Sequence, residues 1–126
     1  MHGIGIDIVE IERFERILSR NKIFLHSCFG DEEFLQISEK KFSCASIAAR
    51  FCVKEAFIKS IGIGIRTIKE FKFIQIMQEK SGRPRLVLKD KFEKLLSELE
   101  FSLSLTHSKT CACAVVICFP KFRTCL

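Results

Sequence analysis

The hydrophobic pattern of the first twenty residues changes its period once. Over residues 3–9, isoleucines alternate with small or polar residues, which predicts a short strand with one apolar face. From Ile11 to Leu18 the apolar residues recur at helical spacing instead, which predicts a helix directly after the strand. Gly3 and Gly5 leave the other face of the strand almost bare, so another element can approach its backbone there.

A second helical pattern, from Phe42 to Ile61, contains no proline or glycine and ends at Gly62. It is apolar nearly all round, and such a helix is usually buried. One broad apolar sector carries Ile47, Ala48, Phe51, Cys52 and Ile58, and the opposite side carries Val53, Phe57 and Ile61. Glu55 lies in the middle of the first sector, with Lys59 one turn further along the same side. A buried carboxylate needs a cation, a metal or hydrogen-bond donors. Either Lys59 satisfies Glu55 or another group does.

The rest of the first half predicts short helices. One covers Ile23–Cys28, and another covers Glu32–Ser38 with Asp31 as its N-cap. The polar residues 39–41 then form a break before the long helix, and Gly62 is followed by a turn or loop that includes Thr67.

The second half is richer in strand patterns. A strand over Phe71–Gln78 and its partner Arg85–Leu88 flank the turn sequence EKSGRP, and a helix capped by Asp90 carries Phe92, Leu95, Leu96 and Leu99. Two further strands, around 101–105 and 111–119, form a central hairpin. We therefore predict an α+β fold in one domain over residues 1–126. It has an N-terminal strand, a helical first half with one long central helix, and an antiparallel sheet from the second half.

Composition narrows the class of protein. The chain has 126 residues, 48% of them hydrophobic, which is enough for a substantial core. No apolar run approaches the length of a membrane span and no signal-peptide pattern opens the chain, so we expect a cytoplasmic protein that does not enter the membrane. The seven cysteines include no C-x-x-C pair, which favours reduced core thiols over a zinc site. The net charge of +6 favours an acidic partner or a phosphorylated substrate.

Three polar features interrupt apolar elements: Asp7, Glu55 with Lys59, and His107. Two carboxylates from separate elements could hold Mg²⁺, which keeps its other positions for water and substrate phosphate. Each residue also has a structural interpretation, which the residues alone favour. Asp7 could cap the first helix with Glu10 completing a capping box, Glu55 could simply pair with Lys59, and His107 could belong to a hairpin turn.

Four motifs add a resemblance. GIGIDIVEIERF at 3–14, RFCVKEAFIKSIGIGI at 50–65, SGRP at 81–84 and SLTHSKTCACAVV at 104–116 together resemble holo-[acyl-carrier-protein] synthase, the small bacterial class of 4′-phosphopantetheinyl transferases. The resemblance covers nearly the whole chain, with the motifs in the same order and spacing as in that family.

The resemblance implies an enzyme that transfers the 4′-phosphopantetheine group of coenzyme A to a serine of apo acyl carrier protein, with adenosine 3′,5′-bisphosphate as the other product. It implies Mg²⁺ as cofactor, with Asp7 and Glu55 as metal ligands and Glu55 and Lys59 as catalytic residues. The serine's general base stays open between Glu55, a metal-bound water and another group. The pathway it implies is fatty acid biosynthesis.

The resemblance also implies a homotrimer with active sites between subunits. Arg13 and, less directly, Arg20 would dock the acidic carrier protein. Lys40 and Lys41 would lie with Arg50 near the coenzyme 3′-phosphate. The residues that it implies for coenzyme A binding are Lys41, Arg50, Lys59, Gly82, Pro84, His107 and Ser108. The chain departs from the family at Cys52 and Val53, where small residues such as alanine are commoner, and at Phe42, where a basic residue is commoner.

Two other functions compete with this one. The charge of +6 would suit a basic module that binds nucleic acid or an acidic protein without Mg²⁺. However, the phenylalanines lie mostly at core spacing and are not interleaved with Arg and Lys, so we expect no nucleic-acid partner. A degenerate transferase kept for its structure is the other alternative, and the presence of Asp7, Glu55 and Lys59 argues against it.

Overall fold

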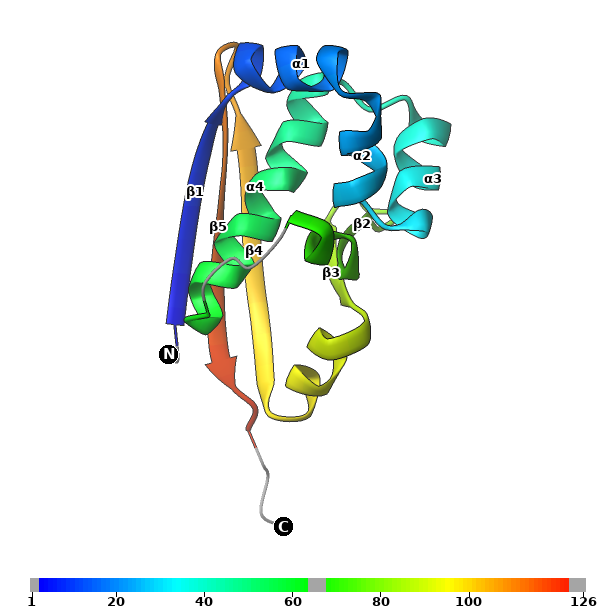
Figure 1. Cartoon of the computed structure of the whole chain (residues 1–126). Helices are drawn as coiled ribbons and strands as arrows, with labels where there is room; N and C mark the ends of the chain where they lie inside the picture. Colours follow the sequence, from blue (N-terminus) through cyan, green and yellow to red (C-terminus); the bar gives the residue numbers. More distant parts are fainter. Residues whose placement is uncertain (1–2, 64–67, 123–126) are drawn as a thin grey trace.

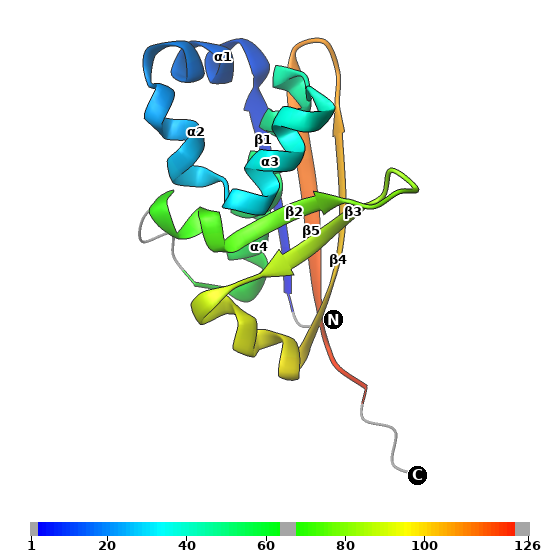
Figure 2. The same cartoon turned by 90° about the vertical axis from the view of Figure 1, so that its right-hand side faces the viewer.

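A computed structural model describes residues 3–63 and 68–122 of the protein. A three-stranded sheet forms one side of the molecule, and the long helix α4 (Cys44–Ile61) packs along its inner face (Figure 1). The remaining helices and a two-stranded hairpin lie beyond α4, and Figure 2 shows the hairpin crossing in front of the sheet. The helices lie on one face of an antiparallel sheet, which is the arrangement of the predicted α+β class. The loop residues Gly64 and Thr67, and Cys125, lie outside the described residues.

The three-stranded sheet is antiparallel, in the order β1 (Gly3–Glu10), β5 (Cys111–Pro120), β4 (Leu99–His107). The predicted hairpin of the last two strands is confirmed, and β5 is the central strand. β1 pairs with the free edge of β5, with Asp7 opposite Ala114. The prediction that the sheet comes from the second half was therefore incomplete, because the first strand of the chain supplies one edge.

α4 begins and ends as the sequence predicts. The hydroxyl of Ser43 accepts a hydrogen bond from the backbone N–H of Ser46 at 3.2 Å, and Gly62 ends the helix with a φ of 76°. Its buried residues lie all round the axis, as expected for a helix between two layers. They are Ile47, Ala48, Ala49, Arg50, Cys52, Val53, Lys54, Ala56, Phe57, Ile58 and Ser60.

The bare face of β1 is where α4 approaches. A Cβ atom on Gly5 would lie 1.8 Å from the carbonyl oxygen of Ala56, and one on Gly3 would lie 2.0 Å from that of Ser60. Backbone cannot move aside as a long side chain can, so only glycine allows this contact. The isoleucines of β1 point outward, with Ile4, Ile6 and Ile8 exposed by 55%, 65% and 67%.

Three helices cover the far side of α4: α1 (Ile11–Arg20), α2 (Lys22–Cys28) and α3 (Asp31–Lys40). Asp31 is the first residue of α3 and not its cap, which corrects the prediction; Gly30 holds the cap position. The carboxylate of Glu33 accepts from the Gly30 N–H at 3.2 Å, while the N–H of Glu33 donates to the Gln75 side chain at 2.9 Å. The side chain of Gln75, which is distant in sequence, thus accepts the hydrogen bond that an N-cap side chain would accept.

The second half contains shorter elements than predicted. The strand expected from Phe71 begins only at Ile74, because residues 71–73 end a 3₁₀ helix, η1 (Ile68–Phe73). β2 (Ile74–Gln78) and β3 (Pro84–Leu88) form the predicted hairpin. After it, η2 (Asp90–Ser97) is 3₁₀ and not α-helical, and Leu99 already belongs to β4. Lys89 and not Asp90 precedes η2 at the cap position.

The six cysteines in the described part of the chain are free thiols, as predicted. Cys28, Cys52 and Cys118 are fully buried and fill core positions. Across residues 3–63 and 68–122, no helix combines the length and apolarity needed to cross a membrane.

Candidate active site

Asp7 and Glu55 come together between β1 and α4. Asp7 lies on the inner face of β1, where its neighbour in register is the buried Ala114. It does not cap the first helix: α1 begins at Ile11, Glu10 holds the cap position, and no side-chain cap bond forms there. The cap interpretation of Asp7, favoured by the residues alone, is therefore wrong. Asp7 is a strand residue facing α4.

The surroundings of Glu55 disfavour its ionised form. The pKa of Glu55 rises to about 7, first because the side chain is partly buried, then because of the negative charge of Asp7 and the hydrogen bond between the two groups. Lys59 lowers this pKa by a smaller amount. A raised carboxyl pKa beside a second carboxylate in a cavity is typical of a functional site.

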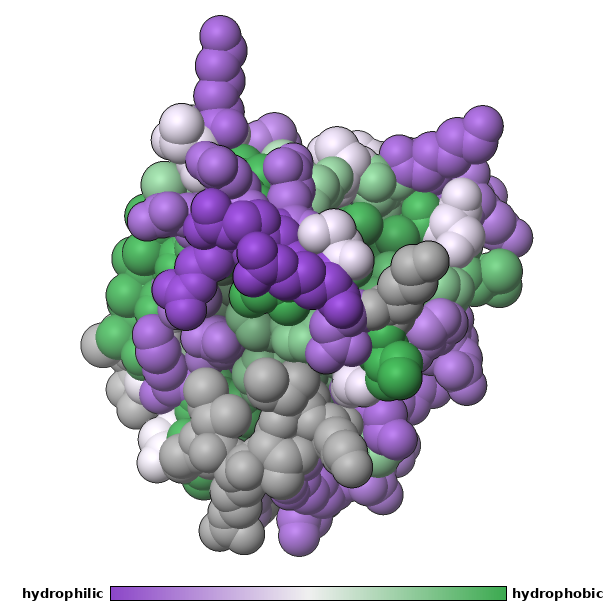
Figure 3. All heavy atoms as spheres, turned by 45° about the horizontal axis from the view of Figure 1, so that its top comes forward, coloured by the Kyte–Doolittle hydropathy of each residue, from purple (hydrophilic) through white to green (hydrophobic). Residues whose placement is uncertain are grey.

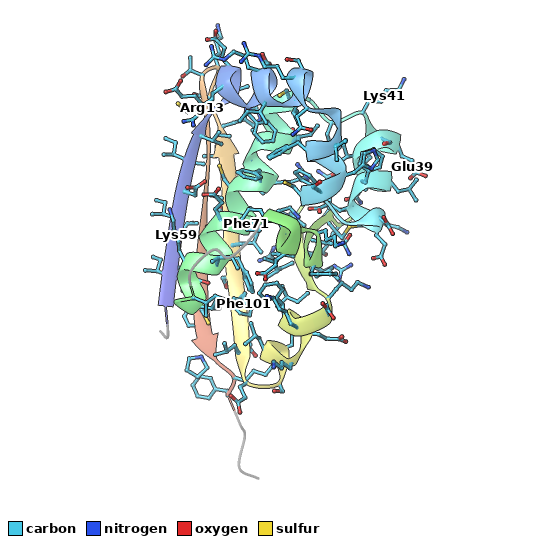
Figure 4. All side chains as sticks on the ribbon, in the orientation of Figure 1. Arg13, Glu39, Lys41, Lys59, Phe71 and Phe101 are labelled. Atoms are coloured by element: carbon cyan, nitrogen blue, oxygen red, sulfur yellow. The ribbon has the colours of Figure 1, made fainter. Side chains whose placement is uncertain are left out.

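Lys59 pairs with Asp7 and not with Glu55. Its ammonium donates to the carbonyl oxygen of Ile6 at 2.9 Å and to Asp7 Oδ1 at 3.3 Å. The side chain of Lys59 is 50% exposed and that of Asp7 14%. Figure 4 shows Lys59 beside β1. Among the described residues, Glu55 makes no ion pair with Lys59, so the simple i,i+4 explanation of Glu55 is not what the fold uses.

A cavity of about 510 Å³ opens beside the two carboxylates. Apolar side chains from β1, α1, α2 and α4 form most of its wall, and charged groups stand on one part of it. The cavity is lined by Asp7, Ile8, Val9, Glu10, Arg13, Phe14, Ile17, Phe24, Phe51, Glu55 and Cys111. An apolar pocket with a few convergent polar groups is the usual form of a small-molecule site.

The donor set suits a hard divalent cation held together with substrate. Among the described residues, no group of three or more His, Cys, Asp or Glu side chains could hold a metal by itself. Mg²⁺ does not need such a group, because it commonly takes one or two carboxylates plus water and phosphate oxygens. Burial and then the negative charge of Asp7 raise the pKa of Glu55, and a cation between the two carboxyl groups would favour its ionised form. Asp7 and Glu55 therefore fit Mg²⁺.

Cys52, one of the departures from the family, lies next to this pair. It is fully buried, and its sulfur lies 3.5 Å from the carbonyl oxygen of Ala112. Burial, and then the charge of Asp7, raises the pKa of the thiol. A neutral, buried thiol packs as a small core residue.

Arg50 is buried more deeply than the sequence suggested, with 5% of its surface exposed. Its Nη1 donates to the Ser46 carbonyl at 3.0 Å, and its guanidinium lies 3.9 Å from the ring centre of Phe42. Burial lowers its pKa. The buried Nε has no partner in the described part of the chain. The aromatic ring at Phe42 thus covers the cation that was expected beside a phosphate.

His107 and Ser108 stand at the turn between β4 and β5, in a different hollow. His107 is exposed. The hydroxyl of Ser108 accepts from the N–H groups of Thr110 and Cys111 at 3.2 and 3.1 Å, so it already organises the turn. This hollow, of about 570 Å³, also contains Ile11, Glu15, Ser43, Cys44, Ala45 and Lys109.

The other residues implied for coenzyme binding lie elsewhere on the chain. Lys41 follows α3 in the left-handed conformation, with a φ of 51°, and Figure 4 places it on the opposite side of the molecule from Lys59. Gly82, with a φ of 90°, forms the exposed turn of the β2–β3 hairpin. Pro84 lines a third hollow, of about 240 Å³, with Arg83 and Arg85. One chain therefore does not bring these residues to a single site.

The two arginines proposed for docking are both exposed on α1. Arg13 also lines the cavity of Asp7 and Glu55, so it borders the candidate active site (Figure 4). Arg20 is the last residue of α1, at the far end of the helix.

Sequence reasoning missed a buried ion pair between Lys54 and Glu33. The two side chains are 0% and 1% exposed, and Lys54 Nζ lies 2.7 Å from Glu33 Oε1. A signal was present, because Lys54 stands within the apolar sequence FCVKEAF on a helix predicted to be buried. A lysine there requires an acidic partner from another element.

Comparison with known proteins agrees with this geometry. A model of the 4′-phosphopantetheinyl transferase superfamily matches residues 3–116. The chain is 41% identical to a holo-[acyl-carrier-protein] synthase of Chloroherpeton thalassium, covering 93% of this chain and 97% of the relative. It is 44% identical to one of Treponema denticola, covering 91% and 95%.

Solved structures show the same fold. The crystal structure of holo-[acyl-carrier-protein] synthase from Neisseria meningitidis superposes with a TM-score of 0.83 at 28% identity, covering 94% of this chain and 98% of that one. The Helicobacter pylori synthase, solved in complex with coenzyme A, gives 0.74 at 33% identity, covering 92% and 99%. The fold and the family match define a 4′-phosphopantetheinyl transferase. The chain belongs to the 4′-phosphopantetheinyl transferase superfamily.

Proposed function

We propose that this protein is a Mg²⁺-dependent holo-[acyl-carrier-protein] synthase, acting as one transferase domain over residues 1–126. It transfers 4′-phosphopantetheine from coenzyme A to a serine of apo acyl carrier protein and releases adenosine 3′,5′-bisphosphate. The observation that carries the proposal is the meeting of Asp7 and Glu55 at one cavity. Family membership and the coenzyme A complex of the Helicobacter pylori relative supply the substrate.

Asp7 and Glu55 would hold Mg²⁺, which when bound would offset negative charge on the coenzyme diphosphate. In the reaction the serine oxygen forms a bond to the phosphorus that bears pantetheine. The bond from that phosphorus to the bridging oxygen breaks, the bisphosphate leaves, and the serine proton is lost. The residues of this chain act by positioning and by charge.

Lys59 is a positively charged neighbour of this reaction centre. Its ammonium is half exposed and bonded to Asp7 at 3.3 Å, so it is anchored and still within reach of solvent. A diphosphate beside Asp7 would receive hydrogen bonds from this cation. We assign Lys59 the role of binding the diphosphate and stabilising the charge that develops on the leaving group.

We propose a homotrimer with active sites between subunits, for two reasons. First, Pro84 lines one hollow and His107 and Ser108 line another, both separate from the cavity of Asp7 and Glu55, so a coenzyme that touches all of them needs more than one copy of the chain. Second, the outer face of the sheet is apolar at Ile4, Ile6 and Ile8. Figure 3 shows hydrophobic surface along the side where β1 lies in Figure 1. Such a face favours association with another copy.

The coenzyme would be held by Lys41, Arg50, Gly82, Pro84, His107 and Ser108, in addition to Lys59. Arg13 would meet the carrier protein at the rim of the cavity, and Arg20 would extend this basic face along α1. Positive charge there would steer an acidic carrier. We place the reaction in the cytoplasm, in support of fatty acid biosynthesis.

The test is to incubate the protein with apo acyl carrier protein, coenzyme A and Mg²⁺ and to follow the mass of the carrier. The expected result is the mass increase of one phosphopantetheine group, abolished by a chelator and restored by Mg²⁺. A known transferase acting on the same sample is the positive control. An unmodified carrier in the presence of that control would refute the proposed function.

A further inference from the structure

Lys54 is a fully buried cation that the proposed reaction does not use. Its ammonium donates to Glu33 Oε1 at 2.7 Å, to the Phe71 carbonyl at 3.0 Å and to the Ile74 carbonyl at 2.5 Å. An ammonium has three N–H groups, so every donor of Lys54 is used. The ring of Phe29 lies 4.7 Å from the same nitrogen. The tip of Lys54 is therefore fixed by acceptors from several segments at once.

Glu33 is fixed equally well. Its Oε1 accepts from the Gly30 N–H at 3.2 Å, and its Oε2 accepts from the Ile76 N–H at 2.8 Å. The ion pair consequently ties together the start of α3, the middle of α4, the end of η1 and strand β2. Both charged groups of this junction are out of contact with water, so water cannot take the place of either partner.

Lys54 is adjacent to Glu55 in the sequence, and this adjacency gives the ion pair its consequence. Consecutive residues on a helix point about 100° apart, so Lys54 reaches α3 and β2 while Glu55 reaches β1. Any rotation or sliding of α4 would move both side chains together. On the β1 side, the close contact of Gly5 with the Ala56 carbonyl also holds the helix in place. α4 is thus fixed from two sides.

We infer that the Glu33–Lys54 ion pair is a positioning device for the active site: it sets the rotation of α4 and thereby directs the carboxylate of Glu55 toward Asp7. Lys54 and Glu33 are positioning residues, because neither lines the cavity of the carboxylates. The inference rests on the proposed function only where activity is the readout. The geometry of Asp7 and Glu55, and their affinity for a divalent ion, test it independently.

The experiment uses the full chain with the double substitution Glu33→Gln and Lys54→Met, which removes both charges together. Ile37→Ala is the matched control, because it removes volume from the core face of α3 but no charge. Mn²⁺ binding is measured by electron paramagnetic resonance without coenzyme, and kcat and KM are measured with coenzyme A. We expect the double variant to fold, to bind Mn²⁺ about tenfold more weakly, and to lose kcat with little change in KM. The control should keep its Mn²⁺ affinity.

A folded double variant with the Mn²⁺ affinity and kcat of the wild type would overturn the inference. So would a crystal structure of this variant in which Glu55 and Asp7 keep their relative position. If the double variant does not fold, Lys54→Arg replaces it, because a planar guanidinium keeps the charge but does not match three acceptors arranged for an ammonium. If the wild type lacks transferase activity, the proposed function fails, while Mn²⁺ binding and the crystal structure still decide the role of the pair.

Discussion

Asp7 on β1 and Glu55 on α4 line the same cavity, where burial and then the negative charge of Asp7 raise the pKa of Glu55 to about 7. A carboxyl group whose pKa is raised in the folded state costs folding free energy when it is ionised. Proteins tolerate such a cost mainly at functional sites, where a ligand relieves it.

Glu55→Gln should abolish most activity without unfolding the protein. The amide keeps the shape of the side chain but removes a charge that would bind the cation, so we expect kcat/KM to fall about 100-fold or more. Asp7→Asn should do the same. Mg²⁺ at ten times its dissociation constant should stabilise the wild type by about 1.4 kcal/mol, seen as a higher Tm, but not the variants. Unchanged turnover in both variants would refute the metal assignment.

The stability of the metal-free protein should depend on pH through Glu55. Its pKa is raised from 4.5 to about 7 on folding, so the folded state holds this proton more tightly than the unfolded state between those two values. Stability should therefore fall as the pH rises from 4.5 through 7. Because the side chain is partly exposed, we expect only about 1 kcal/mol. The difference in Tm between wild type and Glu55→Gln, measured across this range, should change with pH; a constant difference would contradict the prediction.

Gly5→Ala should strongly destabilise the fold. The new Cβ would lie 1.8 Å from the Ala56 carbonyl oxygen, so α4 must move away from β1. We expect a loss of about 3 kcal/mol or more in chemical denaturation. Gly82→Ala is the control: its Cβ meets open space, and only the φ of 90° opposes it, at about 1–2 kcal/mol. Equal losses in the two variants would show that the β1–α4 contact is not tight.

Lys54→Met alone should cost about 3–5 kcal/mol in free energy of unfolding, because it leaves the carboxylate of Glu33 buried without its cation. Adding Glu33→Gln should recover most of that loss, since no uncompensated charge remains. Lys91→Met removes an ion pair with Glu70 whose lysine is 42% exposed, and should cost less than about 1 kcal/mol. Urea unfolding of the four proteins tests the series. A double variant as unstable as Lys54→Met would show that the pair matters for more than charge balance.

Ile6→Glu should disrupt the proposed trimer. Ile6 is 65% exposed on the outer face of the sheet, and a carboxylate at an apolar interface would be buried without a partner. Light scattering should show the mass of one chain in place of three. Ile23→Glu changes an isoleucine that is 73% exposed on α2, away from the sheet, and should leave the mass unchanged. A monomeric wild type would refute the trimer directly.

Much of the fold could be predicted because it depends on local pattern. β1, α1, α4 and the last hairpin follow from strict periodicity and clear end signals such as Ser43 and Gly62. The failures lie where local preference is weak. The apolar residues of 71–73 and of Asp90–Ser97 suit a strand or an α-helix as well, and both segments are 3₁₀ in the structure. Asp31 has the chemistry of a cap, but the side-chain oxygen of Gln75, distant in sequence, accepts a hydrogen bond from the Glu33 N–H, and Gly30 holds the cap position.

The candidate site likewise has features that local sequence pattern predicts and features that depend on packing between distant elements. Motif order and spacing can be identified without coordinates, so the residue types of the site and the family could be predicted from the sequence. It also determined that a charge on the buried α4 needed a partner. The identity of that partner depended on packing, because pairing requires short distances between elements that are remote in the chain. In the folded protein Lys59 pairs with Asp7, and Lys54 pairs with Glu33. Glu55 lies near Asp7 because two glycines of β1 allow α4 to pack against that strand.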